Sequence, residues 1–228
     1  GAVGVGRLKF EGKPKDMPGK QACAAVGQGI LMHIYERLFA EYGQTVAQVL
    51  LTRADTLDRH HYANSRNTFQ KLLEWGVIPV VNENDVVAID EFKIGDNDNL
   101  SALVAGIVDA DVDILLSDVD GLYTANPQSH PDARLISEVP EITPELEAMA
   151  GGAGSSIGKG GMITKVIAAK RAASSGTHTV IASGREPDVM MRLARGEAVG
   201  TLLVSETAPL NARKQWLADH LLLAGQLL

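Results

Sequence analysis

Two neighbouring segments of the sequence concentrate carboxylate and amide side chains. The first reads Asn82-Glu83-Asn84-Asp85 and the second reads Gly95-Asp96-Asn97-Asp98-Asn99. Carboxylates accept hydrogen bonds, whereas side-chain amides both donate and accept them. Such a mixture suits a small zwitterion, because its ammonium binds carboxylates and its carboxylate binds amide N–H groups. A helix expected just after Asp98 adds the positive end of its dipole for an anion.

Each of these side chains also has a structural explanation. Asn, Asp and Gly favour tight turns, and Asp98 or Asn97 could simply be the N-cap of the next helix. Taken one at a time, the residues favour this turn interpretation. Their density over two adjacent segments favours a binding site.

A glycine-rich segment, residues 151–161, leads into a helix predicted over residues 162–174. Glycines let backbone N–H groups approach an anion, and the N-terminus of the following helix points at it. The segment resembles a phosphate-binding loop but is not a Walker loop, because Gly154 and Gly158-Lys159 are one residue too close. The loop alone is weak support for nucleotide binding.

Lys165 makes the phosphate interpretation sharper. It falls in the first turn of the predicted helix, where a cation opposes the helix dipole unless a bound anion lies nearby. The structural alternative is a solvated surface lysine. Phosphoryl transfer depends on positioned cations, and an acidic side chain such as Asp98 can hold an ammonium at the moving group. Lys165 and Asp98 are therefore the candidate catalytic residues.

The elements that must position these residues alternate between helix and strand. Apolar runs and periodicity predict an α/β domain with a mainly parallel sheet. Pro79 indicates that its strand is either an edge strand or a strand whose first residues lie outside the hydrogen-bonded ladder. Ligands bind at the carboxyl ends of the strands in such a sheet. Residues 82–85 and Ser117-Asp118 fall there, although a capped turn explains Ser117 and Asp118 equally well. The predicted helices are 20–42, 58–75, 99–110, 162–174 and 187–195, a hairpin covers 86–94, and the strands are 45–51, 77–81, 112–116, 179–182 and 200–204.

Composition excludes several classes of protein. Hydrophobic residues make up 45% of the 228 residues and aromatic residues only 4%, which is typical of a sheet covered on both faces. The net charge of -7 argues against nucleic-acid binding. Cys23 is the single cysteine, so we expect a buried structural thiol. No apolar run is long enough to span a bilayer and no signal peptide is seen, so we expect a cytoplasmic protein. No metal site is predicted.

Several motifs, in this order along the chain, resemble those of the glutamate 5-kinases. The resemblance covers nearly the whole sequence and is carried by residues 51–55, 80–85, 94–103, 158–165 and 211–216. The glutamate 5-kinases belong to the amino acid kinases, so the resemblance implies a three-layer αβα sandwich with a mainly parallel central sheet. It also implies that the family's first strand, with its phosphate-binding lysine, and its C-terminal PUA domain are missing from this chain.

The resemblance implies that the protein phosphorylates the side-chain carboxylate of glutamate with ATP and Mg²⁺, giving γ-glutamyl phosphate in the first step of proline biosynthesis. Mg²⁺ would be bound by the nucleotide phosphates. Lys165 and Asp98 would act in transfer. The implied glutamate site contains Asp85 and Asn97, with Asn82 and Asp96 close by, and the implied ATP site contains Ser117, Asp118, Lys159, Gly160, Gly161, Met162, Ile163, Thr164 and Lys165.

Further expectations follow from the same resemblance. Proline would inhibit by feedback, and Asp55 and Glu91 are candidates for sensing it. A glutamyl phosphate reductase would receive the product, and the protein would form a homo-oligomer. We expect one domain over residues 1–228, with acceptor binding in roughly 1–110 and nucleotide binding in roughly 111–228. The alternatives are a non-catalytic module that binds glutamate or proline, and another amino acid kinase that acts on acetylglutamate, carbamate or uridylate.

Overall fold

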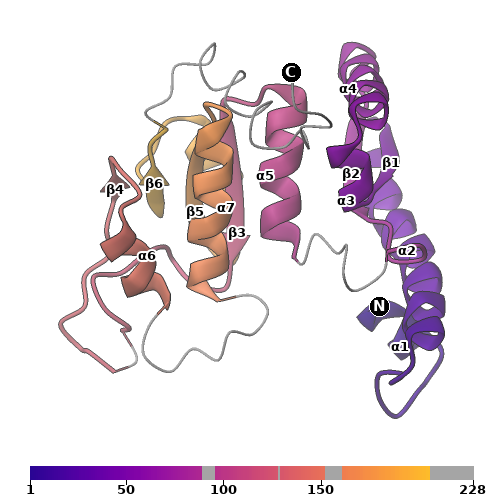
Figure 1. Ribbon diagram of the computed structural model, residues 1–228, viewed down its shortest axis with the longest axis horizontal. Helices are drawn as coiled ribbons and strands as arrows, with labels where there is room; N and C mark the ends of the chain where they lie inside the picture. Colours follow the sequence, from indigo (N-terminus) through magenta and orange to yellow (C-terminus); the bar gives the residue numbers. More distant parts are fainter. Residues whose placement is uncertain (89–95, 128, 152–160, 206–228) are drawn as a thin grey trace, which may run out of the picture. The chain divides into compact units, whose positions relative to one another are not determined.

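The computed structural model describes residues 1–88, 96–127, 129–151 and 161–205. The chain forms two compact units whose boundary lies between Ile94 and Gly95 (Figure 1). The described part of each unit contains its own sheet. The helix that carries Asp98 therefore belongs to the second unit, whereas the sequence suggested a division near residue 110. The functional division of the chain stays a prediction.

The first unit consists of two parallel strands and the helices that precede and connect them. Strands β1 and β2 are in register from Val46 opposite Ile78 to Leu51 opposite Glu83. Helix α2 packs on β1, and α4 packs on β2. The elements are α1 (Ala2–Arg7), α2 (Met17–Ala40), β1 (Val46–Leu51), α3 (Arg53–Leu57), α4 (Arg59–Glu74) and β2 (Ile78–Glu83).

The predicted elements of this unit are confirmed with small shifts in their bounds. Asp58 caps α4, because its carboxylate accepts hydrogen bonds from the main-chain N–H groups of His60 and His61. Pro79 lies inside the ladder opposite Ala47, so the idea that it stands outside the ladder is wrong. In the described residues the sheet has only two strands, which agrees with the edge position that proline requires.

Close packing of α1 on α2 depends on glycine. A Cβ atom on Gly4 would lie 1.8 Å from the carbonyl oxygen of Cys23, and one on Gly27 would lie 2.8 Å from the main-chain nitrogen of Gly4. Cys23 is 1% exposed, so the expected buried thiol is confirmed. The two helices approach closely only because no side chain separates their backbones at these positions.

The second unit is built on a four-stranded sheet of order β3-β5-β6-β4. The β3–β5 and β4–β6 pairs are parallel, and β5–β6 is antiparallel. The sheet is thus mainly parallel, as predicted. The elements are α5 (Asn97–Val108), β3 (Val112–Ser117), β4 (Glu138–Val139), α6 (Pro144–Gly151), α7 (Met162–Ser174), β5 (His178–Ser183), α8 (Val189–Ala194) and β6 (Thr201–Leu203).

Alternate residues of the strands pack in two separate layers. Leu115, Ile181 and Leu203 join the core with α5 and α7, whereas Val180 and Ala182 pack with Val189 of α8 and its neighbours. Both faces of the sheet are therefore covered by helices, which is the αβα arrangement expected from the apolar strands. Gly200 has a φ of +77° and an added Cβ would lie 2.1 Å from the Ile181 carbonyl oxygen.

Most elements of this unit agree with the sequence predictions. The helix over 162–174 is confirmed residue for residue, and α5 begins two residues earlier than predicted. Across the two units, the short elements α1, α3, α6 and β4 were not predicted. The predicted hairpin over 86–94 and the motif at 211–216 lie largely or wholly outside the described residues. Among the helices of the described ranges, none combines the length and apolar character needed to cross a bilayer.

Candidate functional site

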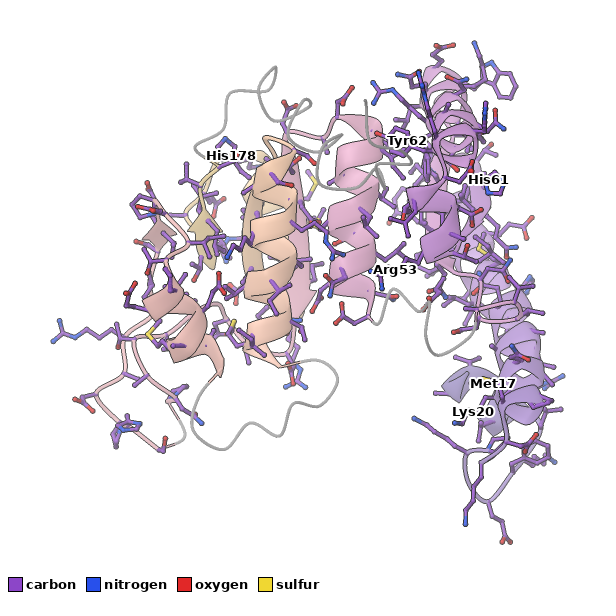
Figure 2. The ribbon with its side chains drawn as sticks, in the orientation of Figure 1. Met17, Lys20, Arg53, His61, Tyr62 and His178 are labelled. Atoms are coloured by element: carbon purple, nitrogen blue, oxygen red, sulfur yellow. The ribbon has the colours of Figure 1, made fainter. Side chains whose placement is uncertain are left out.

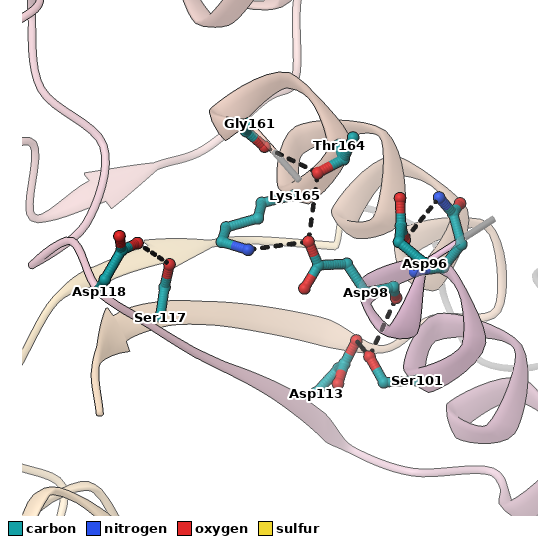
Figure 3. Close-up of polar contacts among 10 residues, drawn as sticks. Asp96, Asp98, Ser101, Asp113, Ser117, Asp118, Gly161, Thr164 and Lys165 are labelled. Atoms are coloured by element: carbon teal, nitrogen blue, oxygen red, sulfur yellow. Dashed lines mark hydrogen bonds and ion pairs between the residues drawn. The ribbon is translucent and has the colours of Figure 1, made fainter. Parts of the chain in front are cut away.

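A buried ion pair joins the starts of α5 and α7. The Nζ atom of Lys165 lies 2.8 Å from Oδ2 of Asp98 (Figure 3). The side chains of Lys165 and Asp98 are only 10% and 18% exposed. The alternative of a solvated surface lysine is therefore wrong. An ammonium has three N–H donors, so Lys165 keeps donors for another anion while it is held by Asp98.

The first turn of α7 contributes a second group to the same carboxylate oxygen. The Thr164 hydroxyl lies 3.2 Å from Oδ2 of Asp98 and 2.7 Å from the carbonyl oxygen of Gly161. Gly161 is the N-cap of α7 and supplies no side-chain cap. Because no side chain caps α7 in the described residues, main-chain N–H groups at its start can bind an anion beside the Lys165 ammonium.

Asp96, not Asp98 or Asn97, is the N-cap of α5. Its Oδ1 atom accepts hydrogen bonds from the main-chain nitrogen of Asn99 at 2.8 Å and from Asn99 Nδ2 at 3.0 Å. Asn97 is exposed in the first turn. The capping explanation offered for Asp98 is therefore wrong, and its carboxylate is free of the cap and turned to Lys165. Asp96 has a structural role whether or not it binds substrate.

Ser117 and Asp118 lie where the sequence placed them, at the carboxyl end of β3. The Ser117 hydroxyl donates to Oδ1 of Asp118 at 3.2 Å, and Asp118 is exposed. This arrangement fits the C-terminal edge of a parallel pair, at which ligands of α/β proteins bind. It also fits a simple turn, so their nucleotide-binding role stays a prediction.

Asn82 ends a chain of side-chain amides in the first unit. Its Nδ2 atom donates to Oε1 of Gln28 on α2 at 3.0 Å, and Nε2 of Gln28 donates to Oε1 of Gln48 on β1 at 3.2 Å. Asn82 Oδ1 accepts from the main-chain nitrogen of Glu83. The Asn82 amide is thus fixed in orientation. Asp85 lies in the turn after β2, where its main-chain nitrogen donates to the Glu83 carbonyl.

The sequence did not reveal Gln28 and Gln48. Nothing in their local sequence distinguishes them from other glutamines, and only the packing of α2 on β1 brings them to Asn82. The predicted acceptor residues are also divided between the units, because Asn82 and Asp85 belong to the first and Asp96 and Asn97 to the second. Whether all four bind one ligand stays a prediction.

Asp55, a candidate for proline sensing, is tied into the start of α3. Its carboxylate accepts from the Thr52 main-chain nitrogen and hydroxyl, each at 2.7 Å, and lies 2.9 Å from Nδ1 of His61. Figure 2 labels His61, which lies on α4. Burial raises the pKa of Asp55, but the hydrogen bonds from Thr52 and His61 outweigh burial and leave it below its ordinary value. Glu91, Lys159 and Gly160 lie outside the described residues.

A buried carboxyl group, that of Asp113, lies near the ion pair. Asp113 is 8% exposed on β3, and its Oδ2 atom accepts a hydrogen bond from the Ser101 hydroxyl of α5 at 3.0 Å (Figure 3). Burial raises the pKa of Asp113 to about 6, opposed by the Ser101 hydrogen bond and reinforced by the negative charge of Asp98. Sequence reasoning missed this residue, although a lone acid in an otherwise apolar strand was a visible signal.

Metal binding by protein side chains alone has no support in the described ranges. No group of three or more His, Cys, Asp or Glu side chains is arranged there to hold an ion. A magnesium ion that travels on nucleotide phosphates does not need such a cage, since it is usually bound by phosphate oxygens, waters and one or two carboxylates.

Comparison with known proteins identifies the family. The model of the amino acid kinase family matches residues 2–183. The chain is 60% identical to glutamate 5-kinase of Methylibium petroleiphilum over 224 residues and 57% identical to that of Ralstonia nicotianae over 225. These alignments cover 98% and 99% of this chain but 60% of each relative. The chain thus spans about three fifths of the length of the curated relatives it matches.

Solved structures show the same fold at low identity. The isopentenyl phosphate kinase of T. acidophilum superposes with a TM-score of 0.55 at 18% identity, covering 89% of this chain and 79% of that one. The UMP kinase of Ureaplasma parvum gives a TM-score of 0.57 at 12% identity, covering 88% and 75%. At this identity the likeness concerns the fold alone, and it supports the predicted αβα architecture.

Proposed function

The chain belongs to the amino acid kinase family, and we propose that it carries the phosphotransferase centre of a glutamate 5-kinase. In this proposal ATP phosphorylates the side-chain carboxylate of glutamate. The observation that carries it is the buried Lys165–Asp98 pair at the start of α7, in a chain 60% identical to a named glutamate 5-kinase.

Lys165 neutralises the phosphoryl group as it moves from ATP to the acceptor. Negative charge spreads over the phosphoryl oxygens in the transition state, and a cation already in place stabilises it without reorganisation. Asp98 holds Lys165 for this role, and the Thr164 hydroxyl contacts the same carboxylate oxygen of Asp98 that receives the ammonium. Low exposure strengthens the interaction relative to water.

The nucleotide is held by the loop and first turn of α7. Residues 159–165 supply main-chain N–H groups and Lys165, and Ser117 and Asp118 at the end of β3 contact the ribose or base. Magnesium, bound to the nucleotide phosphates, supplies further charge neutralisation when present. The residues of this chain orient the phosphates and exclude water around them.

Glutamate is bound by the carboxylates and amides of the two polar segments. Asp85 and Asn97 bind glutamate in this proposal, and Asn82 and Asp96 are further candidates. Carboxylates suit its ammonium, and side-chain amides suit its carboxylates. The product is γ-glutamyl phosphate, an acyl phosphate that enters proline biosynthesis through a reductase. Feedback by proline and a homo-oligomeric state belong to the same proposal.

The experiment that tests the proposal is the capture of glutamyl phosphate as its hydroxamate, with the protein at its full natural length. Lys165→Met should lower kcat by at least about 100-fold, which is the usual effect of removing one group that stabilises transition-state charge. Lys170→Met is the matched control, since Lys170 lies on the same helix with its side chain 60% exposed and paired with Glu147. Equal activity of the wild type and Lys165→Met would contradict the proposal.

Ligand protection against thermal unfolding separates the rival acceptors. A ligand that binds only the folded state raises Tm. Glutamate and ATP should both raise Tm. Stabilisation by glutamate or proline without ATP would indicate a binding module without catalysis, whereas stabilisation by UMP or isopentenyl phosphate in place of glutamate would move the chain to another branch of the family.

A further inference from the structure

Asp113 is a buried ionisable group that the proposed mechanism does not use. It is the second residue of β3 and lies on the face of the sheet that packs against α5 and α7. Its carboxylate is one hydrogen bond away from α5, through the Ser101 hydroxyl at 3.0 Å. An acid in this place needs an explanation, because an apolar residue would fill the same layer without desolvating a charge.

Ser101 connects Asp113 to the residue that holds Lys165. The Ser101 Oγ atom lies 3.0 Å from Oδ2 of Asp113 and 3.0 Å from the main-chain carbonyl oxygen of Asp98. A hydroxyl has one proton, so it donates to one of these acceptors at a time. An ionised Asp113 takes that proton in a charge-assisted bond and ties the first turn of α5 to β3.

Protonation of Asp113 reverses the chain of hydrogen bonds. The neutral carboxyl then donates to Ser101, and Ser101 donates to the Asp98 carbonyl. The tie between α5 and β3 persists, but as a weaker bond between neutral groups. Since the pKa of Asp113 is raised to about 6, both states are reached within the pH range in which enzymes are ordinarily assayed.

The groups that face Asp113 come from three elements. Helix α5 supplies Ser101 and the negative charge of Asp98, β5 supplies Thr179, the register partner of Asp113, and α7 supplies Lys165, which is paired with Asp98. The Thr179 hydroxyl is buried and has no hydrogen-bond partner within the part of the chain that the structure describes. Asp113 is thus in a polar layer, linked to the ion pair through α5.

We propose that Asp113 is a positioning residue for the Lys165–Asp98 pair, acting through Ser101 to fix the first turn of α5. The proposal rests on the proposed function. Asp113 touches no substrate, so its loss should lower kcat and leave the KM values for glutamate and ATP nearly unchanged. Ser101 and Asp113 should act as one unit.

The test compares kcat and KM of the wild type, Ser101→Ala, Asp113→Asn and the double variant between pH 5 and 8, with the protein at its full natural length. At pH 7.5 each single variant should lose roughly three- to tenfold in kcat, corresponding to part of one charge-assisted hydrogen bond. The double variant should be no worse than Ser101→Ala. The ratio of wild-type to Asp113→Asn kcat should fall towards one as pH drops below 6.

Two further variants separate positioning from general damage. Ser174→Ala is the matched control, because Ser174 makes the same hydrogen bond to the carbonyl three residues earlier, on α7, without a carboxylate partner; its kcat should be unchanged. Ser101→Thr keeps the hydroxyl and should restore kcat. Additive losses, a change confined to KM, or a pH-independent ratio would each overturn the proposal.

A measurement without turnover distinguishes failure of this inference from failure of the proposed function. The ¹³Cε NMR signal of Lys165, identified by its loss in Lys165→Met, should show a titration step near pH 6 that is absent in Asp113→Asn and reduced in Ser101→Ala. A step that survives in Asp113→Asn overturns the positioning role. A step that behaves as expected in a protein that forms no glutamyl hydroxamate refutes the glutamate kinase reaction alone.

Discussion

Replacing Asp113 by Asn should make the protein more stable at neutral pH. Asp113 is 8% exposed, and burial disfavours its charged form. Asparagine has nearly the same shape, keeps an oxygen that can accept from Ser101, and carries no charge. The variant therefore removes the desolvation of a carboxylate while it preserves the packing between β3 and α5.

The magnitude follows from the pKa of the folded and unfolded states. The pKa of Asp113 rises from an ordinary value of 3.8 to about 6 on folding, and at 1.36 kcal/mol per pKa unit this corresponds to about 3 kcal/mol. The folded state binds more protons than the unfolded state between pH 4 and 6. Stability therefore falls as pH rises through this window, and the full penalty is present above about pH 6.

Urea denaturation at several pH values between 5 and 8 measures the effect. The difference in the free energy of unfolding between Asp113→Asn and the wild type should grow with pH and reach up to about 3 kcal/mol at pH 8. Taking the difference between the two proteins removes the contribution of the other titrating groups, because these groups are common to both. Asp111→Asn is the control, since it makes the same chemical change at an exposed position just before the same strand.

Two results would refute the reasoning. One is a difference that stays constant across this pH range, which would mean that Asp113 does not titrate there. The other is a less stable Asp113→Asn at pH 8, which would mean that its carboxylate has a stabilising partner. A variant that is both more stable and slower would be strong support for the positioning role, because structural damage does not raise stability.

Three smaller predictions concern other positions. Gly200→Ala should lower the free energy of unfolding in urea by more than roughly 3 kcal/mol, because a φ of +77° is combined with a Cβ only 2.1 Å from the Ile181 carbonyl oxygen. Gly196→Ala, at a φ of +78° but with open space around the Cβ, should lose only about 1 kcal/mol. Equal losses would show that the contact at Gly200 does not matter. Asp96→Ala should lower the free energy of unfolding by about 1 kcal/mol through the lost cap of α5, and unchanged stability would show that the cap is dispensable. Gln28→Met should raise the KM for glutamate several-fold and leave kcat nearly unchanged, because it removes the oxygen that accepts from Asn82. Gln28→Glu keeps that oxygen, so its KM for glutamate should stay close to that of the wild type. Similar KM values in the two variants would show that the orientation of Asn82 is unimportant.

The candidate catalytic pair shows how far sequence reasoning reached. Lys165 was selected because a cation in the first turn of a helix needs an anion nearby, and Asp98 because an acid can hold an ammonium. The structure brings the two within 2.8 Å. The same reasoning attributed the cap of α5 to Asp98 or Asn97 as an alternative, and the structure assigns it to Asp96, because the cap depends on where the backbone leaves the helical region.

Local features of the sequence were enough to predict most helices and strands. Apolar periodicity, the Asp58 cap and glycines at helix ends act over a few residues, so they can be recognised without knowledge of the fold. The exception was short elements such as α3 and α6, which have too few residues for a periodic pattern.

Contacts between distant segments were decided only by the tertiary structure. Lys165 and Asp98 are separated by 67 positions, and Asn82 and Gln28 by 54. Whether such side chains meet depends on strand register and helix packing, which come from the burial of many apolar groups at once and leave no local mark. The sequence shows an acid inside β3, but only the packed layers show that Ser101 connects it to the residue that holds Lys165.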